Sequence, residues 1–270
     1  MRGQAAANAA KALLLVLVLG ALAAGVGWLL ADLRGATLFA FCALLAALGV
    51  TYVGDRALLG MLGARPFALA EDPLLRTTAD RVATRLEVPP PKLSLIEDGF
   101  PRCFVVGRGP RGATLAVSTG LLGALPEDEL EALLAHELAH VRARDVLTQT
   151  HAVLLAATLV ETSRIGGWLS RVLLYVLAPV ASAFTHVLLS PKRELRADAA
   201  AARVSDGGAL AAALIRLDRA SELVSFEASP ATAPLYPVEL FAPEGIARMF
   251  RTHPPLQERV NRLLGTGGRT

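Results

Sequence analysis

The stretch His136-Glu137-Leu138-Ala139-His140 decides which fold this chain can have, because it places H-E-x-x-H inside a segment with a helical pattern. Pro126 opens the segment, and acidic residues fill its first turns, where they complement the helix dipole. Its buried stripe is formed by Leu130, Leu133, Leu134, Leu138 and Val141. Residues four apart share a helix face, so His136 and His140 can reach one metal ion. Glu137 lies beside them, where it can accept a proton from a water that the ion activates.

The alternative is a chance match, with both histidines as ordinary polar residues on a surface helix. The acidic start and the apolar stripe argue against it, because Glu137 and both histidines avoid that stripe. We therefore interpret the motif as a zinc (Zn²⁺) site.

A third protein ligand is expected downstream, in Pro191 to Asp198 (PKRELRAD). Taken alone, Glu194 and Asp198 are typical of a solvated helix face with charges at i and i+4. After the upstream motif, we interpret Glu194 as the third zinc ligand. Asp198, one turn on, can hold a ligating imidazole through its other ring nitrogen.

The composition indicates a membrane protein. Hydrophobic residues make up 53% of the 270 residues and the mean hydropathy is +0.47. The excess is concentrated in uncharged runs, of which 12–30 and 35–54 are each about long enough to cross a bilayer. Asp32 and Arg34 separate the two runs, which predicts a transmembrane hairpin. A cleaved signal peptide ending near Ala21-Leu22-Ala23 is the alternative.

Basic residues give the hairpin an orientation. Arg2 and Lys11 precede the first run, and Arg56 and Arg65 follow the second. The positive-inside rule therefore predicts that the N-terminus and everything after Gly54 face the cytoplasm.

Two further apolar runs, 146–160 and 172–191, come late in the chain. They can form a second hairpin that turns near Gly166 and Gly167. They can equally lie in the membrane interface or pack as core helices.

The remaining segments predict a small domain of helices and strands. Helices are expected over 72–86, 191–203, 208–223 and 255–264, and short strands over 92–97, 103–108 and 113–118. Residues 229–244 have the composition of a loop.

Other residues exclude several classes of function. The net charge of +3 includes no basic block, so no nucleic acid is expected as a partner. Cys42 lies in an apolar run, so Cys42 and Cys103 are expected to form neither a disulfide nor a thiolate metal site. We expect His151 and His186 to pack between helices or to face a polar cavity rather than to bind metal.

At this point the chain resembles a known family, the M48 metallopeptidases, and within it the membrane heat-shock protease group related to HtpX. The resemblance runs from about Gly54 to Leu264 and rests on four segments. They are Pro101 to Leu122 (PRCFVVGRGPRGATLAVSTGLL), His136 to Asp145 (HELAHVRARD), Pro191 to Asp198 (PKRELRAD) and Thr252 to Leu263 (THPPLQERVNRL).

The resemblance implies roles for individual residues. His136, His140 and Glu194 would be zinc ligands and Glu137 the general base. Asp198 would support a ligating histidine, His253 would stabilise the oxyanion, and Arg259 would brace acidic groups near the site. The substrate backbone would add to an edge strand formed by Ala113, Thr114, Leu115, Ala116, Val117 and Ser118.

The expected fold class is mainly α with a small antiparallel β-sheet, a zincin-type (HExxH) metallopeptidase domain fused to about four transmembrane helices. We expect an N-terminal transmembrane hairpin over 1–56 and the first part of the peptidase domain, with the HExxH helix, over 57–145. A second apolar hairpin would cover 146–191, and the second part of the domain 192–270.

The function implied is a zinc-dependent endopeptidase of the bacterial cytoplasmic membrane, multi-pass, with its catalytic domain facing the cytoplasm. Its expected partners are misfolded or membrane protein substrates and the lipid bilayer, in membrane-protein quality control. The alternatives are a prenyl-peptide protease, an intramembrane site-2-type protease and a non-catalytic zinc-binding membrane adaptor. Charged flanks such as Glu131 and Arg142 argue against the intramembrane protease.

One departure supports the adaptor. The family usually has Asn-Ala-Phe where this chain has Arg102-Cys103-Phe104, and often an asparagine at the position of Ala143. Neither change touches a predicted zinc ligand, so an active enzyme is still expected.

Overall fold

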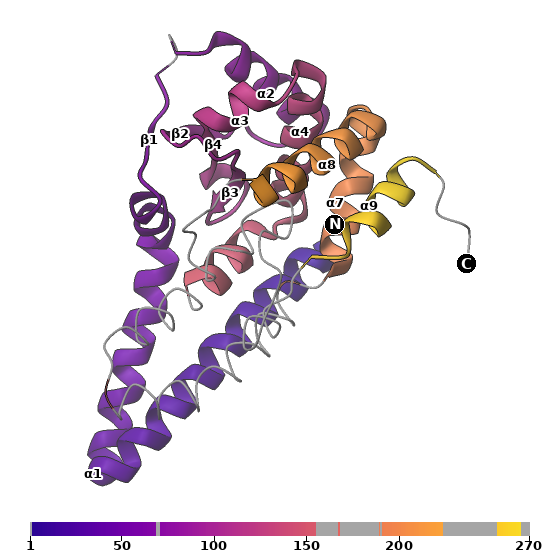
Figure 1. Cartoon of the computed structure of the whole chain (residues 1–270). Coiled ribbons are helices and arrows are strands. Elements are labelled where there is room, and N and C mark those ends of the chain that lie inside the picture. The colour runs from indigo at the N-terminus through magenta and orange to yellow at the C-terminus, as the bar shows by residue number, and fades with distance from the viewer. Residues whose placement is uncertain are drawn as a thin grey trace.

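A long kinked helix and a small sheet covered by helices make up the described part of the chain (Figure 1). The computed structural model describes residues 2–68, 71–154, 167, 189, 191–223 and 253–265. The predicted loop at 229–244 lies outside these residues, as does nearly all of the late apolar run 172–191.

Helix α1 (Arg2–Met61) is two helical arms joined at a kink, where Ala31 and Asp32 leave helical geometry. The arms fold back on each other in Figure 1. They pass so closely that a Cβ on Gly27 would lie 2.2 Å from the carbonyl oxygen of Gly35, so only glycine fits there.

Much of α1 faces outward with apolar side chains, among them Leu29 and Leu30. By length and composition, its segment Val16–Met61 could cross a membrane, with a mean hydropathy of 2.1. It is the one such helix among the described residues. Four transmembrane helices were predicted, and the described residues hold one candidate, this kinked helix.

The sheet has four strands in the order β1-β2-β4-β3. They are β1 (Ala64–Pro66), β2 (Lys92–Ile96), β3 (Cys103–Gly107) and β4 (Ala113–Ser118). β1 is antiparallel to β2, β2 is parallel to β4, and β4 is antiparallel to β3.

Two expectations about this sheet are wrong. The sheet is mixed rather than antiparallel, and 113–118 is not an edge strand, because β4 pairs with both β2 and β3. After β2 the chain forms β3 at the edge of the sheet, and a tight turn then leads into β4, which pairs between β2 and β3. Gly107 permits that turn: its φ is +144°, and a Cβ there would lie 2.2 Å from the oxygen of Gly112.

Helices cover one face of the sheet and create the main core. Cys103 and Val105 of β3 and Leu115 of β4 pack with residues of α2 (Pro73–Arg85), α4 (Glu127–Ala143) and α8 (Gly207–Leu223). Asp72 caps α2 by accepting hydrogen bonds from the N–H groups of Leu74 and Leu75. A short helix, α3 (Thr119–Ala124), follows β4 directly.

The opposite face of the sheet packs against the end of α1 and against residues 146–154, which are helical. Phe104 and Val106 contribute from β3, with Leu58 from α1 and Val153 from the later helix. The sheet therefore connects the long apolar helix to the helical layer that carries α4.

Candidate metal centre

Helix α4 carries His136, Glu137 and His140, and contacts with the neighbouring helices α2 and α8 fix its position. The guanidinium of Arg216 on α8 donates two hydrogen bonds of 2.8 Å to Glu129. Arg85 of α2 donates one of 2.5 Å to Glu131. Arg144 ends the helix in a left-handed conformation (φ 59°), and its N–H caps the carbonyls of His140 and Val141.

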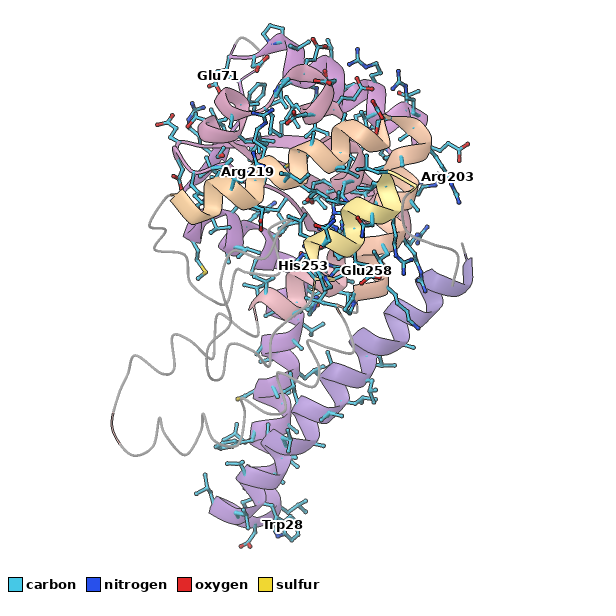
Figure 2. All side chains as sticks on the ribbon, turned by 45° about the vertical axis from the view of Figure 1, so that its right-hand side comes forward. Trp28, Glu71, Arg203, Arg219, His253 and Glu258 are labelled. Atoms are coloured by element: carbon cyan, nitrogen blue, oxygen red, sulfur yellow. The ribbon has the colours of Figure 1, made fainter. Side chains whose placement is uncertain are left out.

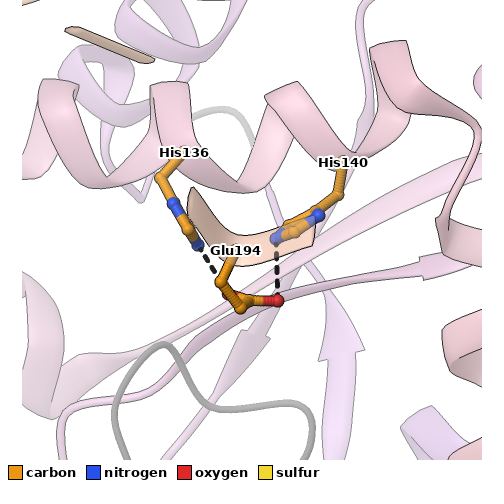
Figure 3. Close-up of side chains that lie close together, drawn as sticks. All are labelled: His136, His140 and Glu194. Atoms are coloured by element: carbon orange, nitrogen blue, oxygen red, sulfur yellow. Dashed lines mark ion pairs between the residues drawn. The ribbon is translucent and has the colours of Figure 1, made fainter. Parts of the chain in front are cut away.

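Three side chains converge from α4 and α7 (Pro191–Val204), as Figure 3 shows. Nε2 of His136 lies 3.4 Å from Oε2 of Glu194, and Nε2 of His140 lies 3.6 Å from Oε1. Candidate ligand atoms of the three residues lie within 4.8 Å of one another. The structure thus brings together the three residues predicted to hold zinc.

The environment of these groups fits a cation. All three are at most 2% exposed, although buried ionisable groups are costly without a partner. Burial alone would raise the pKa of Glu194, yet His140 and Arg193 hold it well below its usual value, so the carboxylate stays charged. Two imidazoles and one carboxylate suit Zn²⁺ and leave a fourth position open, as catalytic zinc sites do.

Asp198 supports His136 from the next turn of α7. Its Oδ1 lies 2.9 Å from Nδ1 of His136. Burial lowers the pKa of His136, but the carboxylates of Asp198 and Glu194 outweigh it and raise the value to about 9. Arg259, on α9 (Leu256–Leu263), binds Asp198 from the other side.

His253 lies just before α9 and reaches the same centre. Its Nε2 is 3.7 Å from Oε2 of Glu194, and its side chain is 6% exposed. Burial lowers the pKa of His253 to about 4, with help from Arg259 and Arg193 and against Glu194. The imidazole is therefore neutral at pH 7 and can donate one hydrogen bond.

Glu137 is 3% exposed and interacts electrostatically with His136, His140 and Glu194. Burial raises its pKa, while the neighbouring His136 and His140 oppose that shift. Its charge also contributes, after burial, to a raised thiol pKa at Cys103 on β3. The charge of Glu137 is therefore felt both at the two imidazoles of α4 and at Cys103 of β3.

Among the described strands, β3 rather than β4 lies at an edge of the sheet, with no strand paired on its outer side. Arg102 accepts a hydrogen bond from the N–H of Ser118, so alternation turns the backbone groups of Cys103 and Val105 away from β4. In the described part of the chain, Thr150 covers one end of this side by accepting from the N–H of Gly107 at 3.3 Å.

Sequence reasoning missed two residues of the site. Arg193 donates to Oε1 of Glu194 at 2.7 Å. Oδ2 of Asp145 lies 3.7 Å from Nδ1 of His140. Both residues belong to the quoted motifs. Arg193 directly precedes Glu194, and Asp145 follows His140 by five positions, so their place in the motifs was the available signal.

The structure also locates the residues left outside the site. Arg102 forms an ion pair with Asp98 and lies over the ring of Phe100. His151 packs between helices, as predicted, with Nε2 3.1 Å from Oγ1 of Thr51 on α1. His186 lies outside the described residues.

Comparisons with known proteins agree with this geometry. The profile described as Peptidase family M48 matches residues 69–266. A protein named "Protease HtpX homolog" from Acidiphilium cryptum is 37% identical over 93% of each chain. One of the same name from Pelotomaculum thermopropionicum is 35% identical over 95% of this chain and 98% of its own.

A solved structure shares the fold. The crystal structure of Ste24p from S. mikatae superposes with a TM-score of 0.51 at 18% identity. The match covers 83% of this chain, which spans 57% of that one.

Proposed function

Because the chain belongs to peptidase family M48 and is a membrane-associated metalloprotease, we propose that His136, His140 and Glu194 bind one zinc ion for peptide-bond hydrolysis. The observation that carries this proposal is the convergence of the three buried side chains from two helices. A zinc ion held there would supply Lewis acidity to a peptide carbonyl and to the attacking water.

Glu137 acts as the general base. It takes the proton of the attacking water and later delivers it to the leaving amine. Its burial keeps bulk water away, and its raised pKa brings it nearer to the range in which one group can both accept and release a proton.

His253 stabilises the oxyanion that forms on the scissile carbonyl. A neutral imidazole can donate a hydrogen bond to that oxygen, and its contact with Glu194 places it beside the centre. Asp198 and Arg259 position His136 rather than touch substrate.

The substrate backbone adds to β3. Strand addition needs a strand with an unpaired side, and β4 is paired on both sides. Cys103 and Val105 turn their backbone groups to the unpaired side. The substrate strand would replace the contacts that bury this side in the free protein.

The enzyme works on misfolded or membrane proteins in the cytoplasmic membrane, as a multi-pass protein with its catalytic part in the cytoplasm. The outward apolar side chains of α1 and the basic residues Arg2, Lys11 and Arg56 support this placement. The family relationship also supports a role in membrane-protein quality control.

Zinc titration of the full chain tests the ligand set. The protein is purified in detergent with a chelator, dialysed, and titrated with zinc by calorimetry. Wild type should bind one zinc per chain, and Glu194→Gln should bind it far more weakly. Glu258→Gln, which alters a surface carboxylate of α9, is the matched control and should bind as wild type does. Unchanged binding by Glu194→Gln would refute the ligand set.

A further inference from the structure

A cavity of about 270 Å³ lies beside the metal centre, between α4 and α7. Its lining is strongly basic: Arg142, Arg193, Arg196 and Arg203 contribute, together with His140 and Asp145. The remaining lining residues are four alanines, whose small side chains leave the hollow that the arginines surround.

Among the described residues, acidic groups balance only part of the positive charge of the cavity. Arg142 lies 3.5 Å from Glu87, and Arg193 is paired with Glu194. Arg196 and Arg203 form no ion pair with any acidic residue in the described part of the chain, and both are exposed. The one carboxylate of the lining, Asp145, is directed to His140. Within the described residues, the guanidinium groups of Arg196 and Arg203 are therefore available to a ligand.

The arrangement on α7 separates this site from the metal. Arg193, Arg196 and Arg203 recur at i, i+3 and i+10, which places them on one helix face. Glu194 and Asp198 point from a different face toward the histidines. The same helix thus presents carboxylates to the metal centre and guanidinium groups to the cavity.

The chemistry of the lining points to a phosphate group. Guanidinium groups match phosphate oxygens with paired hydrogen bonds, and two unmatched cations balance a phosphate monoester, which carries a charge of about −2 at neutral pH. The cavity is also somewhat smaller than the ~300–1,000 Å³ of typical small-molecule sites. We propose that this cavity binds a phosphate-bearing anion.

Two sources could supply that group. Arg142 and Arg193 flank the apolar segment 146–191 in sequence, one before it and one after. A phosphate headgroup at the membrane surface would lie within reach of such flanking arginines. Free phosphate or a soluble phosphomonoester has the same recognition chemistry, so the test separates the two.

The test measures the thermal unfolding midpoint of the zinc-loaded full chain. It is recorded in phosphatidylcholine nanodiscs with increasing inorganic phosphate, and in nanodiscs that contain phosphatidic acid. Sodium chloride at matched ionic strength controls for screening. The test variant carries Arg196→Gln and Arg203→Gln, which leave Arg193 on Glu194. Arg219→Gln, an exposed arginine of α8 on the other side of the lobe in Figure 2, controls for lost surface charge.

We expect phosphate to raise the midpoint of the wild type and of Arg219→Gln, and the double variant to bind phosphate about tenfold more weakly or worse. Stabilisation by phosphatidic acid alone would identify a lipid headgroup, and stabilisation by inorganic phosphate a free anion. The proposal is overturned if neither stabilises the protein. It is also overturned if the double variant responds as wild type does, since the phosphate would then be bound elsewhere, for example at the zinc.

Discussion

Both carboxylate oxygens of Asp198 accept hydrogen bonds from the guanidinium of Arg259, at 2.7 and 2.8 Å, although the residues are 61 positions apart. Arg259 is 1% exposed and Asp198 is 3% exposed. The pair fixes the carboxylate that contacts His136, and so connects the C-terminal helix to the metal centre.

Replacing Arg259 with alanine should therefore damage both stability and metal binding. Removal of one partner from a buried ion pair leaves an unpaired charge and costs about 3–5 kcal/mol of the free energy of unfolding. Loss of support for a ligating histidine should weaken zinc binding about 10–100-fold. Chemical denaturation and zinc titration measure the two effects.

Arg262→Ala is the matched control, on the same helix. Arg262 is paired with Glu258 at the surface, where ion pairs contribute about 0–1 kcal/mol. If Arg262→Ala were as harmful as Arg259→Ala, general damage to α9 would explain the result better than the loss of the Asp198 contact.

Zinc binding should depend on pH because a proton competes for His136. The pKa of His136 is raised to about 9 without metal, so this imidazole must lose a proton to become a ligand at neutral pH. We expect the zinc association constant to rise about tenfold per pH unit for each proton displaced, between pH 6 and 8.5. Asp198→Asn removes a carboxylate that raises the pKa of His136, so in this variant the association constant should reach its plateau at a lower pH. A pH-independent affinity in wild type would contradict this account.

Protonation of His136 should also make the stability of the zinc-free protein depend on pH. Because the folded pKa of His136 is above the unfolded value, its contribution is fully present below about pH 6.5 and is lost as the pH rises through about 9. Thermal unfolding of chelated protein at several pH values measures this loss. In His136→Gln, the part of the pH dependence that belongs to this group should disappear.

Amide exchange can identify the strand that receives the substrate. A peptide hydroxamate bound to the zinc-loaded protein should slow hydrogen–deuterium exchange in β3, at Cys103 and Val105, whose N–H groups face away from β4. β4 should change little, because its amides already pair with β2 and β3. Slowed exchange in 113–118 without a change in β3 would contradict the assignment to β3.

The hairpin of α1 depends on close packing of two glycines. Gly27→Leu would place a side chain against the backbone of Gly35, so we expect a lower unfolding midpoint in detergent. Gly25→Leu is the control, since a Cβ at Gly25 meets nothing within 4 Å. Equal midpoints for the two variants would show that the arms do not pack as described.

The metal centre was readable from sequence because its signals are local. His136 and His140 lie one turn apart on a helix whose start and buried stripe are explicit, and Glu194 and Asp198 repeat that spacing on α7. The ends of β2, β3 and β4 were predicted within one residue, and Gly107 and Pro110 mark the break between β3 and β4. The short strand β1 was not predicted.

The sheet order could not be read in the same way. Which strand lies at the edge depends on how the chain crosses from β2 to β3. Asp98, Gly99 and Pro101 indicate a turn there, but a turn does not determine which strand β3 pairs with. Arg193 and Asp145 were missed because a charged neighbour of a ligand looks like any surface charge until burial is known. The domain boundaries at 56, 145 and 191 stay predictions.

Proteolysis by the zinc-loaded chain tests the central claim most directly. Cleavage of an unfolded protein is followed with zinc, with chelator, and in Glu137→Gln, which should bind zinc as wild type does. We predict zinc-dependent cleavage in wild type that falls about 10²–10⁴-fold in Glu137→Gln. Equal cleavage by the variant would contradict the role of Glu137. Zinc binding without any cleavage by wild type would favour a non-catalytic adaptor.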